Sequence, residues 1–432
     1  MLCAAVLDVT RFGATPNDST DDTAAIQRAI NASAIGDTIS FPSGEYRLSN
    51  TLTFKSDRSY SAQASVSLKQ LVRNTFIAAT ERDHGQNVTL SGLTFDGGGI
   101  IYAGSGNVPA QSILITNCTF ENITCTTYPM NSAIYIPIGG IHCDIVANTF
   151  TNIMGDNAIC AWKLASCSIT DNYFDTVNEG AHINDNCLNL IVARNTGVRM
   201  HRMGFEFQGG GFTNFIVEDN HFSHWSAPFM DSFGLSIANA GFHIIVRYNT
   251  ILGRPPTSGT WTDRYGYGIE VGNDDATVDN FIEGFFWYGI IVGGAHAVVT
   301  NNVLRGPTNG SYQQPSQSAF EPGGDPATAM VTNNLHVATA SFIENPDRLR
   351  TNAIRPTRVD LAWADNSTNE TGFKVERRLP GGRYAVIATL DANITSFSDL
   401  TTTPNTHYIY RIHAFNSLDE TYSPVLLVTT PL

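Results

Sequence analysis

Residues 167–174 read CSITDNYF and residues 180–184 read GAHIN, and both segments recur along the chain. In the first segment, apolar residues alternate up to an asparagine that is usually followed two positions later by a large side chain. Its copies contain Asn117, Asn148, Asn172, Asn195, Asn220, Asn249, Asn280, Asn302 and Asn334. Because a unit of roughly 22 to 32 residues cannot bury its apolar face alone, the copies must stack. The repeat therefore predicts a parallel β-solenoid in which equivalent strands pair from coil to coil.

The stacked asparagines carry two further expectations. We expect their side chains to form a hydrogen-bonded ladder at one turn of the solenoid, and asparagine tolerates left-handed backbone geometry at such a turn. The variable repeat length places the extra residues in loops at one turn, which is where function usually sits.

The second segment begins with a small residue and then alternates. Its copies begin at Ala133, Ala158, Gly180, Gly204, Gly234, Gly268, Gly289 and Ala319. Positions two and four are almost all apolar and are expected to point inward, so position three points outward. The outward residues, in order, are Tyr135, Cys160, His182, Glu206, Ser236, Glu270, Ile291 and Glu321. Polar and charged groups gather in the middle coils, which predicts a groove there.

The opening segment, residues 8–54, combines FGA at 12–14, DDT at 21–23 and FPSGEY at 41–46. This combination resembles the N-terminal signature of pectate-lyase-3-type proteins of the pectate-lyase-like superfamily. With the repeat, the resemblance extends to about residue 343, and it implies a right-handed parallel β-helix. A helix from about Asp22 to Asn31, capped by Asp21 or Thr20, is expected to close the open end. The superfamily includes lyases, hydrolases, epimerases and phage tailspikes, so the fold alone does not settle the function.

From about residue 345 the asparagine repeat stops, and VDLAW at 359–363 and HYIYRIHAFN at 407–416 follow. These segments resemble a bacterial fibronectin type III domain, with Trp363 and Tyr410 as core aromatic residues. We therefore expect an all-β chain. A parallel β-helix with an N-terminal capping helix spans residues 8–344, and a fibronectin type III-like β-sandwich spans residues 345–432.

The formal net charge of −14 argues against nucleic acid and anionic membranes as main partners. No apolar run approaches the ~20 residues of a membrane-spanning helix. None of the seven cysteines forms a CxxC pair, so we assign no metal site, and Cys143 and Cys167 are expected to be core thiols rather than a disulfide. Residues 2–7 look like the remainder of a trimmed leader. The domain types favour a secreted, extracellular protein, and the capping helix and the additional sandwich favour a monomer.

Glycoside hydrolysis needs one carboxylic acid and one carboxylate. Glu206 and Glu270 share the outward column, two coils apart. With strands spaced at about 4.8 Å, their backbones should lie roughly 9–10 Å apart. Side chains could then bring the carboxyl groups into the roughly 6.5–9.5 Å range of inverting hydrolases. We predict Glu206 and Glu270 as catalytic residues, with Asp231 between them.

Other polar and aromatic residues near this column suit a sugar, because side-chain hydrogen bonds hold hydroxyl groups and aromatic faces cover the apolar side of the ring. The predicted substrate-binding residues are His182, Arg202, Asp185, Gln208, Asn239, His201, Trp261, Tyr267 and Trp287. The predicted partner is a polysaccharide or an oligosaccharide. A hydrolase of this kind needs no cofactor.

Two alternatives stay open. A polysaccharide lyase would cleave an acidic polysaccharide by β-elimination, with a base such as Arg202 or His182 and with calcium held by carboxylates. A non-catalytic glycan-binding or tailspike-like protein would bind a glycan without cleaving it. The acidic charge favours the hydrolase, because an acidic groove suits neutral sugars better than uronides.

Overall fold

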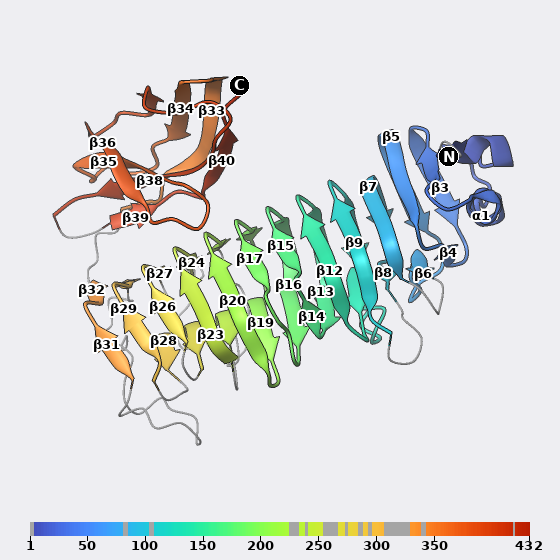
Figure 1. Ribbon diagram of the computed structural model, residues 1–432, viewed down its shortest axis with the longest axis horizontal. Helices are drawn as coiled ribbons and strands as arrows, with labels where there is room; N and C mark the ends of the chain where they lie inside the picture. The colour runs from blue at the N-terminus through green and yellow to red at the C-terminus, as the bar shows by residue number, and fades with distance from the viewer. Residues whose placement is uncertain are drawn as a thin grey trace.

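Each sequence repeat forms one coil of a parallel solenoid, and the coils stack with equivalent strands paired in register (Figure 1). The computed structural model describes residues 4–80, 85–102, 108–223, 233–237, 241–253, 267–272, 275–283, 288–292, 296–305, 329–337, 343–417 and 420–432. The expected all-β solenoid is confirmed.

The solenoid strands form three parallel ladders. The first leads into the asparagine turn and contains β1 (Val6–Asp8), β2 (Thr38–Phe41), β5 (Arg58–Gln70), β7 (Gln86–Asp96), β9 (Ala110–Thr116), β12 (Gly140–Val146), β14 (Leu164–Ala165), β15 (Ser168–Thr170), β17 (Ile191–Ala193), β20 (Phe212–Glu218), β23 (Gly241–Arg247), β26 (Ala276–Val278), β29 (Val298–Thr300) and β31 (Met330–Thr332). The second follows that turn and contains β3 (Gly44–Leu48), β10 (Thr119–Ile123), β13 (Thr149–Trp162), β16 (Tyr173–Asn184), β18 (Thr196–Val198), β21 (His221–Ser223), β24 (Thr250–Leu252), β27 (Phe281–Glu283), β30 (Val303–Arg305) and β32 (Leu335–Val337), together with the ends of β5 and β7. The third contains β4 (Leu52–Phe54), β6 (Ala78–Thr80), β8 (Ile100–Ile101), β11 (Ile134–Ile136), the ends of β13 and β16, β19 (Met203–Gln208), β22 (Phe233–Ile237), β25 (Tyr267–Val271) and β28 (Tyr288–Val292).

The asparagine ladder forms as predicted, except at its first member. Its side-chain amides bond from coil to coil through Asn148, Asn172, Asn195, Asn220, Asn249, Asn280, Asn302 and Asn334. The prediction that Asn117 is the first ladder residue was wrong by one residue. Cys118 occupies that position, and its N–H donates to Asn148 Oδ1 at 2.9 Å.

Left-handed backbone geometry occurs at the ladder turn, one residue ahead of the ladder asparagine. The left-handed residue is the one directly before the ladder asparagine, such as Asp171 with φ 59° before Asn172. Asn117, with φ 53°, occupies this preceding position in its own coil. The ladder asparagine's amide is held by its neighbours, while the residue before it makes the sharp turn.

Close packing between coils explains the small residue that opens the second segment. A Cβ on Gly204 would lie 2.2 Å from the carbonyl oxygen of Gly234, and one on Gly180 would lie 2.6 Å from that of Gly204. Stacked phenylalanine rings fill the interior, with Phe120 and Phe150 centroids 5.2 Å apart. These contacts hold the third ladder in fixed register against the core.

Helix α1 (Thr23–Ala32) follows the 3₁₀ turn η1 (Val9–Phe12), and its Ile26 and Ile30 are fully buried. It packs against η1 and β4 at the N-terminal end of the solenoid, as the capping prediction requires. The helix begins one residue later than expected, with Asp22 at the N-cap position. The Asp21 carboxylate still accepts a hydrogen bond from the Thr23 N–H at 3.0 Å, whereas Asp22 binds the Thr15 N–H instead.

Two antiparallel sheets form the C-terminal sandwich. One contains β33 (Asp347–Arg355), β34 (Arg358–Ala364) and β37 (Ser396–Asp399), and the other contains β35 (Gly372–Arg378), β36 (Ala385–Asp391), β38 (His407–Phe415), β39 (Glu420–Tyr422) and β40 (Leu426–Thr429). Trp363 and Tyr410 are buried in its core, as expected. The fibronectin type III assignment and the boundary at residue 345 stay predictions.

Buried polar contacts join the sandwich to the solenoid beside the asparagine turns. Arg378, whose side chain is fully buried, contacts Asp219 and lies 3.4 Å from Glu218. The Tyr384 hydroxyl donates to Asp219 Oδ1 at 2.8 Å. Figure 1 shows the sandwich beside the C-terminal coils. The contacted residues belong to the first ladder and its turns, whereas the predicted groove lies on the third ladder.

Acid is expected to destabilise the sandwich through Glu376. This buried carboxylate accepts a hydrogen bond from Arg411 at 2.7 Å and lies 3.2 Å from His413 Nδ1. Burial alone would raise its pKa, but Arg411 and His413 outweigh burial and lower the pKa to about 2. Because this pKa lies below the ordinary 4.5, the stabilisation is present above pH 4.5 and is lost as the pH falls towards 2. It amounts to about 3 kcal/mol.

Urea unfolding of the full chain from about pH 6 to about pH 3 checks this expectation. The free energy of unfolding should fall more steeply with acid in the wild type than in Glu376→Gln. Glu344→Gln changes an exposed carboxylate and should follow the wild type. Equal pH dependence in the wild type and Glu376→Gln would contradict the assignment.

Among the described residues, no helix is long and apolar enough to cross a membrane. All the described cysteines are free thiols. Cys143 and Cys167 are buried in adjacent coils, and the Cys143 N–H donates to Cys167 Sγ at 3.2 Å. The expectation of core thiols at these two positions is confirmed.

Candidate functional site

The predicted outward column forms on the third ladder. Strand register pairs Tyr135 with Cys160, Cys160 with His182, His182 with Glu206, Glu206 with Ser236, and Glu270 with Ile291. Ser236 on β22 and Glu270 on β25 are the next neighbours in the column, because the residues directly before them, Leu235 and Ile269, are paired. The column therefore places Ser236 directly between Glu206 and Glu270. Glu321 lies outside the described residues.

The N-terminal end of this column is covered. Tyr135 and Cys160 are buried in a small cluster with Phe76, against which Met130 and Trp162 pack. Exposure returns at the next coil, where the His182 side chain is 21% exposed, whereas the Glu206 side chain, one coil further, is only 8% exposed. The accessible part of the predicted groove therefore begins at His182.

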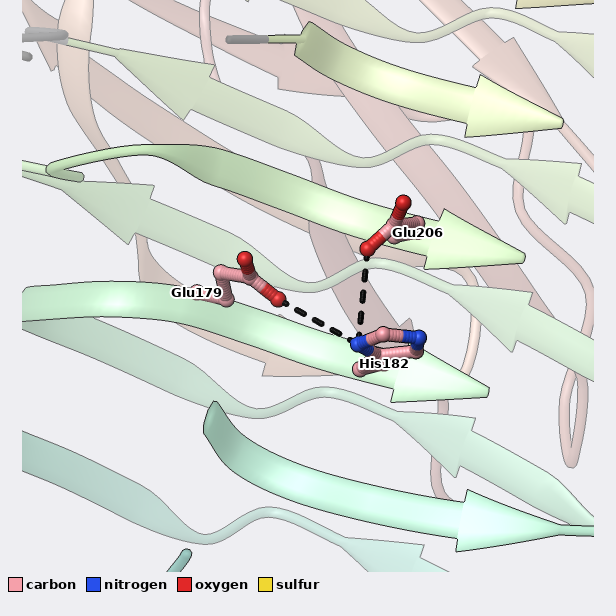
Figure 2. A group of neighbouring side chains, drawn as sticks. All are labelled: Glu179, His182 and Glu206. Carbon is pink, nitrogen blue, oxygen red and sulfur yellow. Dashed lines mark ion pairs between the residues drawn. The ribbon is translucent and has the colours of Figure 1, made fainter. Parts of the chain in front are cut away.

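Glu179, His182 and Glu206 form a compact group that we call the Glu–His–Glu cluster (Figure 2). His182 Nδ1 lies 3.7 Å from Glu179 Oε2 and 3.4 Å from Glu206 Oε2. On the other side of the ring, Nε2 lies 3.0 Å from Asn184 Oδ1 and 3.3 Å from Gln208 Oε1. Oxygen atoms therefore face both ring nitrogens and fix the orientation of the imidazole.

Glu179 was not predicted from the sequence, although it is the most buried member of the cluster. Its side chain is fully buried, Arg202 contacts its Oε1, and its Oε2 makes no hydrogen bond. Burial raises its pKa to about 8; the carboxylates of Glu206 and Asp156 add to this rise, and Arg202 opposes it. Glu179 is one residue ahead of Gly180, where the repeated segment begins.

Asp156 adds a third carboxyl group beside the cluster. Burial raises its pKa, against the opposing charges of His182 and Arg202. Asn131 Nδ2 donates to its Oδ2 at 3.1 Å. Three carboxyl groups thus lie around one histidine and one arginine on neighbouring coils of the sheet.

The other predicted site residues that the structure describes occupy different positions around this centre. Glu270 Oε2 accepts a hydrogen bond from Ser236 Oγ at 2.7 Å. His201 Nδ1 lies 3.0 Å from Asn178 Oδ1, and burial lowers the pKa of His201. Asp185 lies in the left-handed turn after β16, where its Oδ1 leaves no room for a side chain at Gly209. Gln208 and Arg202 are therefore the predicted binding residues in contact with the cluster.

Four predicted site residues, Asp231, Asn239, Trp261 and Trp287, lie outside the described residues. Tyr267 lies in β25, where its backbone pairs with Phe233, but its side chain lies outside the description.

Comparison with known proteins identifies the architecture. A family model described as "Right handed beta helix region" matches residues 83–282. The solenoid is a right-handed parallel β-helix. A second family model, described as "Rhamnogalacturonase A/epimerase, pectate lyase-like", matches residues 6–63 of this β-helix, and the two matches support the pectate-lyase-like superfamily. No curated protein matches the chain.

Solved structures match the chain at low sequence identity. The N-terminal fragment of bacteriophage phi29 gene product 12 is 15% identical with a TM-score of 0.55, and the match covers 77% of this chain and 66% of that fragment. PfbA, a surface adhesin of Streptococcus pneumoniae, is 12% identical with a TM-score of 0.53, and covers 90% of this chain and 99% of its own. A family 28 exopolygalacturonase of Yersinia enterocolitica is 12% identical with a TM-score of 0.41, covering 77% and 78%.

Proposed function

We propose that this chain is a polysaccharide-degrading enzyme, a glycoside hydrolase whose catalytic carboxylates are Glu206 and Glu270. The observation that carries the proposal is their place in one outward column with only Ser236 between them. The family model for rhamnogalacturonase A and epimerases over residues 6–63 supports a polysaccharide as substrate. The bound chain would run along the third ladder, across the strands.

Two strand spacings separate the backbones of Glu206 and Glu270 by roughly 9–10 Å. This leaves space for a water molecule and a glycosidic oxygen between the carboxyl groups, as inverting hydrolysis requires. Glu179 lies within 4.8 Å of Glu206, but its side chain is fully buried, whereas that of Glu206 is 8% exposed. Glu270 is therefore the better partner for Glu206.

The neighbouring residues have distinct roles in this proposal. His182 holds the Glu206 carboxylate from 3.4 Å, and Ser236 orients Glu270 through its hydroxyl. Gln208, an exposed side chain beside His182, is placed to bind a sugar hydroxyl. Arg202 contacts Glu179 and so acts through the cluster rather than as a free base.

The test is a panel of neutral and acidic polysaccharides incubated with the wild-type chain. Reducing ends and the absorbance of unsaturated uronides are followed together. Release of reducing ends without unsaturation is expected. Unsaturated products would replace the hydrolase with a lyase, and binding without cleavage would replace it with a glycan-binding protein.

A further inference from the structure

The Glu–His–Glu cluster brings three potential metal ligands together on neighbouring coils. The nearest ligand atoms of Glu179, His182 and Glu206 all lie within 4.8 Å of one another. We propose that this cluster binds one divalent transition-metal ion, Zn²⁺ or Mn²⁺, through His182 Nδ1 and one carboxylate oxygen from each glutamate. This site differs from the carboxylate calcium site that a lyase would need, because it includes a histidine ligand. The proposal does not depend on the proposed hydrolysis.

The separations fit a small ion. Zinc bonds of about 2.0–2.2 Å in tetrahedral geometry place ligand atoms roughly 3.3–3.6 Å apart. His182 Nδ1 lies 3.4 Å from Glu206 Oε2 and 3.7 Å from Glu179 Oε2. Because His182 and Glu206 are paired residues on adjacent strands, the sheet itself fixes their spacing. Small rotations of the two glutamates complete the site.

The unpaired oxygen of Glu179 points independently to a ligand. Glu179 is fully buried, its Oε2 has no hydrogen-bond partner, and this atom faces His182 (Figure 2). A buried polar atom without a partner is costly and needs an explanation. Arg202 contacts the other oxygen, Oε1, and so leaves Oε2 for an ion.

The surroundings of His182 also match a metal ligand. A ligating histidine usually gives its other ring N–H to an oxygen acceptor, which fixes the tautomer. His182 Nε2 lies 3.0 Å from Asn184 Oδ1. A proton on Nε2 leaves the Nδ1 lone pair directed at the two glutamates.

Local charge and ligand type select the ion. The carboxyl groups of Glu179, Glu206 and Asp156 lie beside His182, and Arg202 is the guanidinium cation that opposes them. Because ligating carboxyl groups are deprotonated in the metal-bound state, the two glutamates match the charge of one divalent cation. An imidazole with two carboxylates suits Zn²⁺ or Mn²⁺, whereas Ca²⁺ takes six to eight oxygen ligands.

Isothermal titration of the full chain, first treated with EDTA and then freed of it, tests the site without any polysaccharide. Zn²⁺ or Mn²⁺ should bind at one site per chain, and Ca²⁺ and Mg²⁺ should bind far more weakly. His182→Ala and Glu179→Gln should each weaken binding at least about 100-fold, since each removes a ligand. His142→Ala is the matched control, because His142 is an exposed histidine on β12 in the first ladder, away from the cluster.

Circular dichroism of each variant excludes loss of the fold as the cause. If Glu179→Gln fails to fold, His182→Gln gives the same test at a ligand whose side chain is 21% exposed rather than fully buried. Failure of the wild type to bind either ion at millimolar concentration would overturn the proposal. Wild-type affinity in folded His182→Ala would overturn it equally.

Discussion

Replacing Glu206 with glutamine should lower the rate of polysaccharide cleavage by about 10²- to 10⁴-fold, the usual contribution of a positioned acid or base. The amide keeps the size of the side chain but cannot exchange a proton with the substrate. Glu270→Gln should cause a loss of the same order, because hydrolysis needs both carboxyl groups. The assay contains EDTA, so that Glu206 is not occupied as a metal ligand.

Glu121→Gln is the matched control for both variants. Glu121 is a partly buried carboxylate on β10 in the second ladder, away from the column. This variant should retain wild-type activity. Wild-type turnover in either Glu206→Gln or Glu270→Gln, at unchanged circular dichroism, would remove that residue from the catalytic pair.

Loss of one ladder asparagine should strongly destabilise the solenoid. Asn195 Oδ1 accepts hydrogen bonds from the Asn172 N–H at 3.1 Å and from Asn172 Nδ2 at 3.0 Å. Its own Nδ2 donates to Ile169 O at 2.8 Å and to Asn220 Oδ1 at 2.9 Å. Asn195→Ala leaves the buried Asn172 N–H without its acceptor and removes one of the two hydrogen bonds of Asn172 Nδ2 and of Asn220 Oδ1. The free energy of unfolding should therefore fall by about 4 kcal/mol.

Urea unfolding followed by circular dichroism measures this loss. Asn50→Ala is the control, because Asn50 is an exposed asparagine outside the ladder. Its unfolding midpoint should stay close to that of the wild type. An Asn195→Ala midpoint equal to the wild-type value would show that the ladder contributes little to stability.

The outward column was predictable because strands alternate with a period of two and parallel stacking repeats each position on the next coil. His182 and Glu206 therefore occupy the same position in the segments GAHIN and GFEFQ, and the structure pairs them on adjacent strands. The one-residue error at Asn117 has a different origin. Asn148 lies two residues before Phe150, but Asn117 lies three residues before Phe120. The spacing therefore already favoured Cys118 for the ladder position, and the residue type misled the prediction; the hydrogen bond from the Cys118 N–H to Asn148 shows the position.

Glu179 could not be predicted from alternation. Val177 and Ala181 are both buried apolar residues on the same strand, so a period of two places Glu179 in the core with them. The register between β13 and β16 shifts between Ile153 and Asn157, where strict alternation is interrupted. Glu179 turns towards His182 after this irregularity. The tertiary contact with Arg202, 23 residues later, has no local sequence signal.

Proton NMR of the newly formed reducing end tests the pairing of Glu206 with Glu270 most directly. The spectrum is recorded during the first minutes of hydrolysis by the wild-type chain, before the anomers equilibrate. A pair separated by one intervening strand predicts that the first product has the inverted anomeric configuration. A retained configuration would contradict the account, because it requires carboxyl groups only about 5–5.5 Å apart.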